Sequence, residues 1–242
     1  MKLIKQITVL IALSLAAIEF TNGYAQGPQQ KLIQVLFSES EPGIEPYTTR
    51  LLLGEQYLRL DDGSDDSDYL LFDLNTRDIH SFSHEDETHL VIKSGPAQKV
   101  DFKIDFQIQQ QTLDDAPKIG GIVPAQHRFY ADSCQCRESI NVKGMLPGIT
   151  QAMIDYEQAL VVQNQQTFER VPNSLKTSCY MANNFLYASA YLEQGFPMLV
   201  SDYLGKRKQL ISYAAVDKPL SLMQFKNEYR VYYPGLSKKA QN

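Results

Sequence analysis

Hydrophobic and polar residues alternate most regularly in the segment VDFKIDFQIQ, residues 100–109. A period of two places the apolar side chains on one face of a β-strand and the polar side chains on the other. The alternation therefore predicts a half-buried strand with one wet face, which is typical of an antiparallel sheet with a single covered face. The side chains expected to face the interior are Val100, Phe102, Ile104, Phe106 and Ile108.

Shorter apolar runs predict further strands on both sides of this segment. They are rich in β-branched, aromatic and leucine residues, and polar turn sequences separate them. Their hairpin spacing predicts an antiparallel meander in the first half of the chain. The candidate strands are KLIQVLFSE, YTTRLLLGEQYLRL, YLLFDL, DIHSFS, HLVIK and AQHRFYAD.

Two segments in the second half carry apolar residues at helical spacing instead. The first is GITQAMIDYEQALVVQNQQTF, which follows Pro147 and is closed by Pro172. The second is SLKTSCYMANNFLYASAYLEQG, which ends at Gly195. Strands are predicted again in FPMLVSDYL, QLISYAAV and LMQFKNEYRVYY. Runs of strands with segregated helices indicate an α+β fold. We expect a curled antiparallel sheet, or half-barrel, with two or three helices covering its concave face.

The N-terminal residues 1–25 have the pattern of a secretory signal peptide. Two lysines precede an apolar run, and Gly23 and Ala25 supply the small residues of a cleavage site. The apolar run, Ile7–Ile18, is too short for a comfortable transmembrane helix. We therefore expect export and a periplasmic location after cleavage near Ala25.

The remaining residues, 26–242, contain no linker rich in Pro, Gly or Ser, which favours a single domain with a helical insert at about 147–195. The formal net charge of −5 argues against nucleic acid as a partner, because nucleic acid rewards basic patches. The short basic run Lys206–Lys208 beside Gly205 is interpreted as a solvated turn. Contact with a membrane would be peripheral only.

Two stretches carry a resemblance to a known family. YLRLDDGSDDSDYLLFDLNTRDIHSF is similar to a strand–turn–strand hairpin of that family, and in YLEQGFPMLVSDYLGKRKQLIS a helix ends at Gly195 before a Gly-Phe-Pro step starts a strand. The chain resembles the periplasmic lipoprotein-carrier superfamily (LolA/LppX-like), whose members are half-barrels of antiparallel strands closed by helices. The resemblance implies an apolar cavity between sheet and helices that shelters an acyl chain or another hydrophobic ligand. The tract from Cys134 to Pro172 does not match the family pattern.

The chain contains three cysteines, two of them in the stretch YADSCQCRES. In an oxidising compartment two of three cysteines usually pair. Cys134 and Cys136 are poor partners for each other, because a ring with one intervening residue has strained geometry. We expect a disulfide that joins Cys179 to either Cys134 or Cys136. A thiolate site for Cu(I) or zinc, completed through the fold by Cys179 and His127, is the alternative.

Two other motifs invite a metal and are interpreted as turns. HEDETH has His84 and His89 five residues apart rather than the four of a zinc-protease helix, and its flanks predict strands. We expect a hairpin turn with the two histidines as a facing cross-strand pair. DDGSDDSD lacks the glycine position of a calcium loop and predicts a solvated hairpin loop. We therefore predict neither a metal ligand nor a cofactor.

The sequence has no G-x-S-x-G elbow, no Walker loop and no glycine-rich dinucleotide turn. The favoured function is a non-enzymatic periplasmic binding or carrier protein for a lipid or acyl chain. Leu51, Leu53 and Phe72 are expected to line its interior behind the five apolar residues of the alternating strand. The alternatives are a cysteine-based metal-handling or redox accessory and a protein-interaction or assembly factor of the cell envelope. The expected partners are a hydrophobic small molecule or lipid and an envelope protein.

Overall fold

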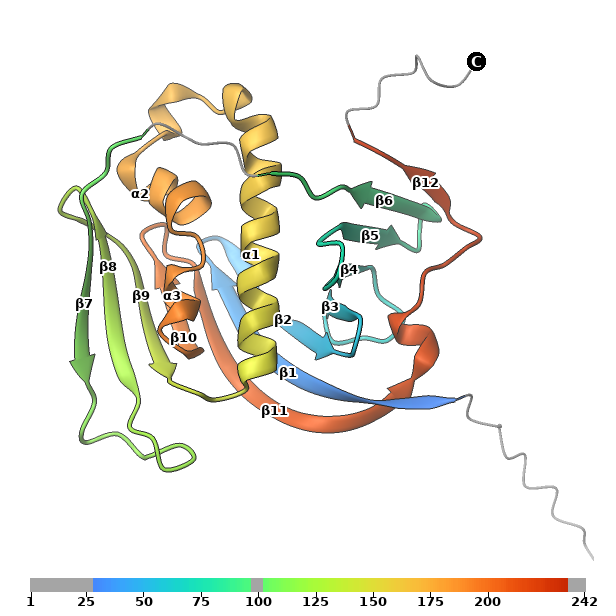
Figure 1. The fold of residues 1–242 in the computed structure, drawn as a ribbon, viewed down its shortest axis with the longest axis horizontal. Coiled ribbons are helices and arrows are strands. Elements are labelled where there is room, and N and C mark those ends of the chain that lie inside the picture. The colour runs from blue at the N-terminus through green and yellow to red at the C-terminus, as the bar shows by residue number, and fades with distance from the viewer. Residues whose placement is uncertain (1–27, 97–101, 235–242) are drawn as a thin grey trace, which may run out of the picture.

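The structure is a computed structural model that describes residues 28–96 and 102–234. Twelve strands form one sheet in the order β12-β6-β5-β4-β3-β2-β1-β11-β10-β9-β8-β7. Figure 1 shows that the sheet is curled but not closed, and that helix α1 (Pro147–Thr167) crosses its concave face. The expected α+β half-barrel with helices on the concave face is confirmed.

The strand bounds follow the predicted runs closely in the first half of the chain. All neighbouring strands are antiparallel except β12 and β6, which are parallel, so the sheet is mixed rather than purely antiparallel. The strands are β1 (Gln29–Glu41), β2 (Ile44–Leu53), β3 (Tyr57–Asp61), β4 (Tyr69–Asp73), β5 (Ile79–Ser83), β6 (Thr88–Ile92), β7 (Phe106–Thr112), β8 (Ala125–Ala131), β9 (Cys134–Val142), β10 (Phe196–Asp202), β11 (Arg207–Pro219) and β12 (Arg230–Tyr232).

Strands β3 to β5 are covered on both faces, which explains the nearly continuous apolar sequence of β4, YLLFD. Leu58 and Phe72 belong to the main core, which lies between the concave face and α1. Leu71 and Phe82 point to the opposite face and pack in a second core with Met223. Successive side chains in these strands thus point to opposite faces of the sheet, and both faces are buried.

The segment that follows β11 covers this second core. The sequence predicts one long strand in LMQFKNEYRVYY, and that prediction is wrong. A 3-10 turn, Leu220–Met223, comes first, and only Arg230–Tyr232 forms a strand. Phe225 and Tyr229 pack onto the second core from outside, so these apolar residues cover a sheet face rather than extend the sheet.

The second predicted helix is also corrected. It is divided into α2 (Ser178–Met181), a π-helical turn (Ala182–Leu186) and α3 (Ala190–Glu193). Asn183 donates to the backbone carbonyl of Cys136 at 3.1 Å, which ties the π-helical turn to β9 and competes with regular helix geometry. The segment ends at Gly195, where φ is 123° and an added Cβ would lie 2.8 Å from the carbonyl oxygen of Val142.

The alternating segment 100–109 is the largest error of the sequence analysis. Val100 lies outside the described residues, and strand β7 begins only at Phe106. β7 is a terminal strand that pairs with β8 alone, and both Phe102 and Ile108 are 41% exposed. The alternation therefore marks a strand at the end of the sheet whose apolar face is only thinly covered. Phe106 does contact the helical segment, since its ring stacks on Tyr187 with centroids 3.7 Å apart.

Candidate functional site

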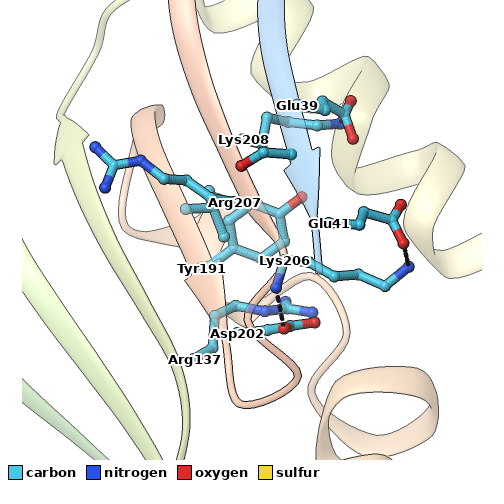
Figure 2. Close-up of a pocket in the computed structure, with 10 residues that line it drawn as sticks. Glu39, Glu41, Arg137, Tyr191, Asp202, Lys206, Arg207 and Lys208 are labelled. Atoms are coloured by element: carbon cyan, nitrogen blue, oxygen red, sulfur yellow. Dashed lines mark hydrogen bonds and ion pairs between the residues drawn. The ribbon is translucent and has the colours of Figure 1, made fainter. Parts of the chain in front are cut away.

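A charged cleft lies where β1 ends and where the β10–β11 hairpin turns (Figure 2). Its volume is about 130 Å³. The hairpin turn is fixed by Asp202, whose carboxylate accepts the backbone N–H groups of Leu204 at 2.9 Å and Lys206 at 3.0 Å. This turn sets the two lysines at the cleft. The lining residues are Glu39, Ser40, Glu41, Arg137, Tyr191, Val200, Asp202, Lys206, Arg207 and Lys208.

Two lysines in the cleft are paired with two glutamates of β1. Lys206 lies 2.7 Å from Glu41, and Lys208 lies 2.8 Å from Glu39. The hydrogen bond with Glu41 raises the pKa of Lys206, and the same bond lowers the pKa of Glu41. The hydroxyl of Tyr47 also donates to Glu41 at 2.9 Å. The Lys206–Glu41 pair therefore stays ionised across the neutral range, and its two charges compensate each other.

Two guanidinium groups in the cleft are not neutralised in this way. Arg137 lies over the ring of Tyr191, 4.5 Å from its centroid, and donates to the carbonyl oxygen of Ala188 at 2.8 Å. Arg207 donates to the side chain of Gln209 at 3.2 Å. Within the described ranges neither arginine lies within 4.0 Å of a carboxylate oxygen. Asp202 lies opposite Arg137 across the strands, and it is the third carboxylate of the cleft beside Glu39 and Glu41. With four basic side chains, the cleft keeps one excess positive charge.

The inner wall of the cleft is apolar and belongs to the main core. Tyr191 is only 6% exposed, its hydroxyl donates to Glu157 of α1 at 3.1 Å, and burial raises its pKa well above the usual value. Val200 packs against the same core. The ammonium group of Lys208 lies 5.4 Å from the ring centroid of Phe37, a buried core residue. The charged opening and the apolar interior thus share side chains.

The residues expected to line a ligand cavity are not brought together at this cleft. Leu51 and Phe72 are buried in the main core, and Leu53 packs at its margin. Ile104 packs near the disulfide, and Phe106 contacts both that region and the main core. Phe102 meets the ring of Phe168 edge-on, and Ile108 is exposed. None of these described residues belongs to the charged cleft.

The cysteine stretch forms a tight hairpin between β8 and β9. Asp132 and Ser133 both have positive φ, as a two-residue type I′ turn requires. Asp132 also accepts the hydroxyl of Ser178 at 2.6 Å, which ties the turn to α2. Cys136 forms a disulfide with Cys179, which is one of the two expected pairings, and Cys134 is an exposed free cysteine. A site with three thiolates would need this disulfide to be reduced.

The histidine and aspartate motifs both form turns, as expected, but their contacts differ from the prediction. His89 pairs across the strands with Phe82, and its ring nitrogen contacts that of His80 at 2.9 Å. His84 instead contacts the hydroxyl of Tyr229. Asp61 is buried between Arg50 and Arg59, whereas the sequence analysis placed it in a solvated loop. Across the described residues no group of three or more His, Cys, Asp or Glu side chains is arranged to hold a metal ion.

Sequence reasoning missed the charged cleft. The interpretation of Lys206–Lys208 as a turn is correct for its first residue only, because Arg207 and Lys208 already belong to β11. Glu39 and Glu41 lie 165 or more positions before Lys206 and Lys208 in the chain. The antiparallel pairing of β1 with β11 brings the two acidic residues next to the two lysines. The sequence did contain a signal. Two acidic residues stand two apart at 39 and 41, two basic residues stand two apart at 206 and 208, and residues two apart share one face of a strand.

Comparisons with known proteins add little to this geometry. The chain matches no family model and no curated protein. It is similar to PNGF-II, solved in the C2 and P21 space groups, with a TM-score of 0.41 and 10% sequence identity in each case. The match covers 84% of this chain and 31% of PNGF-II. In the described part of the chain, no helix combines the length and apolar character needed to span a membrane.

Proposed function

We propose that this protein is a non-enzymatic periplasmic binding protein for an amphipathic ligand, a lipid or another molecule with an acyl chain and an anionic head. The observation that carries the proposal is the contact between the charged cleft and the main core. Tyr191 and Val200 line the cleft and also pack in the core between the sheet and α1. A head group in the cleft would therefore lie next to the apolar interior.

The charge of the cleft favours an anionic head. Neither Arg137 nor Arg207 forms a salt bridge within the described residues, and the cleft has one more basic side chain than acidic ones, with Asp202 opposite Arg137. An arginine guanidinium binds carboxylate and phosphate groups through two parallel hydrogen bonds, which gives direction as well as charge. Lys206 and Lys208 add positive potential close by, although their glutamate partners compensate most of it.

The acyl chain would enter the main core between α1 and the sheet. A cleft of about 130 Å³ holds a head group only, so core side chains must rearrange around the chain. Met145, Met153 and Met198 all pack in this core, and methionine adapts its shape more readily than branched residues. Burial of each methylene of the ligand would contribute about 0.8 kcal/mol.

The proposed compartment agrees with two independent features. Residues 1–25 have the pattern of a signal peptide, and a disulfide joins Cys136 to Cys179. Disulfides persist in oxidising compartments such as the periplasm. The proposal thus places the mature protein in the cell envelope, with a ligand drawn from the lipids there.

Native mass spectrometry of protein purified without detergent tests this function. We expect a species whose added mass corresponds to a lipid or fatty acid. Arg207→Glu should reduce its occupancy, with binding about tenfold weaker, because the head group would then face a carboxylate. Arg230→Glu is the matched control, since Arg230 is also exposed but lies on β12 at the far end of the sheet.

Two results would contradict the proposal. The first is a single apo mass after mild extraction, with no uptake of added oleate or phosphatidylglycerol. The second is an equal loss of ligand in both arginine variants, because binding would then not depend on the cleft.

A further inference from the structure

The segment that covers the second core is held to the sheet by few contacts. Residues 224–232, called the strap below, follow the 3-10 turn and end in β12 beside β6 (Figure 1). β12 pairs with β6 at three positions only, and the backbone N–H of Arg230 donates to the carbonyl oxygen of Glu87 at 2.9 Å. The side chains of Phe225 and Tyr229 pack on the second core and are only partly buried. So few contacts are typical of a segment that opens locally before the rest of a protein unfolds.

The chain just before the strap is fixed more firmly. The carbonyl oxygen of Leu222 accepts a hydrogen bond from the buried guanidinium group of Arg59 at 2.8 Å. The side chain of Met223 is buried in the second core. An opening movement of the strap would therefore hinge after Met223 and leave the 3-10 turn in place.

Three of the four histidines in the chain lie beneath the two rings of the strap. The centroid of the Phe225 ring lies 4.5 Å from that of His80 and 5.4 Å from that of His89. His84 contacts the hydroxyl of Tyr229. Imidazole is the side-chain group that ordinarily changes its charge between pH 5 and 8. The strap thus rests on groups that respond to mild acid.

The contact between His80 and His89 requires that the two rings share one proton. Nδ1 of His80 lies 2.9 Å from Nε2 of His89, so one of these nitrogens donates and the other accepts. Both side chains are buried. A first added proton places a charge beneath Phe225. A second added proton must occupy the accepting nitrogen, which ends the hydrogen bond and sets two cations side by side. Protonation of both rings therefore opposes the closed strap.

The groups around this pair do not remove the conflict. Asp78 and Asp73 favour the charged form of His80 and Lys93 opposes it, but Asp78 is already paired with Lys93 at 2.7 Å. The other groups packed on the two histidines are uncharged rings, namely Phe225 from the strap and Phe82, whose ring stacks on His89. Burial outweighs the carboxylates and lowers the pKa of both histidines, that of His89 to about 4.

His84 responds differently to a proton. A tyrosine hydroxyl can donate to a neutral imidazole and accept from a charged one, so the contact with Tyr229 survives protonation. The charged groups that act on Tyr229 are the carboxylates of Asp68, Glu87 and Glu228, which stay ionised between pH 7 and 5. The response to acid therefore depends on His80 and His89 rather than on His84.

We propose that residues 224–232 form a pH-sensitive strap, which opens in mildly acidic surroundings when His80 and His89 become protonated and release Phe225 from the second core. Opening hinges after Met223, frees the edge of β6 and uncovers apolar side chains of the second core such as Phe82. The strap lies at one end of the sheet and the charged cleft lies near its middle, so this inference does not depend on the proposed lipid ligand.

Hydrogen exchange measured by mass spectrometry at pH 7 and pH 5 tests the strap, with labelling times scaled for the intrinsic exchange rate at each pH. The pKa of His89 rises from about 4 in the closed state towards 6.5 in water, and this change alone raises the opening equilibrium about 20-fold between pH 7 and pH 5. We expect exchange in residues 224–232 to accelerate by at least this factor, while residues 32–39 of β1 keep their protection. Return to pH 7 should restore the protection of the strap.

His80→Gln/His89→Gln removes both titrating rings, and His84→Gln is the matched control, since His84 also contacts the strap. We expect the pH response of the strap to fall below about twofold in the double variant and to stay near 20-fold in the control. If the glutamines already open the strap at pH 7, proton NMR of the histidine rings in the natural chain decides. The strap must then open over the pH range in which His80 and His89 become protonated.

Three results would overturn the proposal. One is unchanged protection of residues 224–232 between pH 7 and pH 5. Another is a parallel loss of protection in the strap and in β1, because acid would then unfold the whole protein rather than open one segment. The third is a pH response that persists in the folded double variant or disappears in His84→Gln.

Discussion

Strands β3 to β5 are covered on both faces, whereas in β8 and β9 one face carries partly exposed polar side chains such as Arg128 and Glu138. The first region buries charge as well as apolar surface: Asp61 lies between Arg50 and Arg59, and Arg59 donates to the carbonyl oxygen of Leu222 at 2.8 Å. The second region holds its helical segment with a disulfide instead. A sheet that is covered on both faces buries polar groups, and these groups need partners inside the protein. A sheet that is covered on one face has a thinner core, and a disulfide can supply the missing stability.

The strongest way to break the first region is to remove its buried carboxylate. Asp61→Ala leaves two guanidinium groups without their shared partner in a buried site, and we expect the free energy of unfolding to fall by about 3 to 5 kcal/mol. Urea denaturation followed by circular dichroism measures this loss. Asp155→Ala is the control, since its salt bridge with Arg77 is partly exposed and should contribute less than about 1 kcal/mol. Equal losses in both variants would contradict the importance of the buried network.

The second region should be most sensitive to its disulfide. The link spans 43 residues, and closure of a loop of this length contributes about 4 kcal/mol in the chain-entropy model. Cys136→Ser/Cys179→Ser should therefore lower the urea midpoint strongly, while Cys134→Ser should leave it nearly unchanged. Thiol titration of unfolded, non-reduced protein should find one free thiol. Three free thiols would contradict the disulfide and would favour a thiolate metal site instead.

A smaller effect should distinguish the first region through pH. Burial lowers the pKa of His80, and it lowers the pKa of His89 to about 4. In the unfolded chain His89 is protonated near pH 6.5, but in the folded protein it is protonated only near pH 4. The free energy of unfolding therefore falls as the pH drops between these values. Each histidine contributes less than about 1.4 kcal/mol for each pH unit.

Unfolding in urea at pH 7, 6 and 5 tests this dependence. His80→Gln/His89→Gln should show a flatter decline than the natural chain, because neither glutamine titrates. An unchanged decline would mean that another group, such as Asp78 beside His80, dominates the loss of stability in acid.

The sequence predicts those parts of the fold whose neighbours are near in the chain. The hairpins from β3 to β6 and the helix α1 follow from local patterns of two and of three to four residues. The alternation of residues 100–109 could not show that its strand would lie at the end of the sheet, because exposure depends on what covers Phe102 and Ile108. Similarly, Phe225 and Tyr229 are residue types that are common in strands, but here they cover the second core on the sheet. Only tertiary contacts decide whether such a segment extends a sheet or covers one of its faces.

The candidate site depends even more on distant contacts. The cleft joins Glu39 and Glu41 to Lys206 and Lys208, and the pairing register of β1 with β11 alone brings them together. Ring geometry narrows the disulfide to two pairings, but a regular strand would place Cys134 and Cys136 on the same face. A β-bulge in β9 leaves Cys136 without a partner residue in β8, and Cys136 is fully buried while Cys134 is exposed.

The pairing of β1 with β11 also constrains the order in which the protein can fold. β1 ends at Glu41 and β11 begins at Arg207, so the middle of the sheet joins segments from opposite ends of the chain. Closure of so long a loop is costly, and folding slows as contacts become less local. While the chain emerges from its N-terminal end, β1 has only β2 beside it until the last strands follow. The hairpins β2 to β6 can form early, but the half-barrel is completed only by nearly the whole chain.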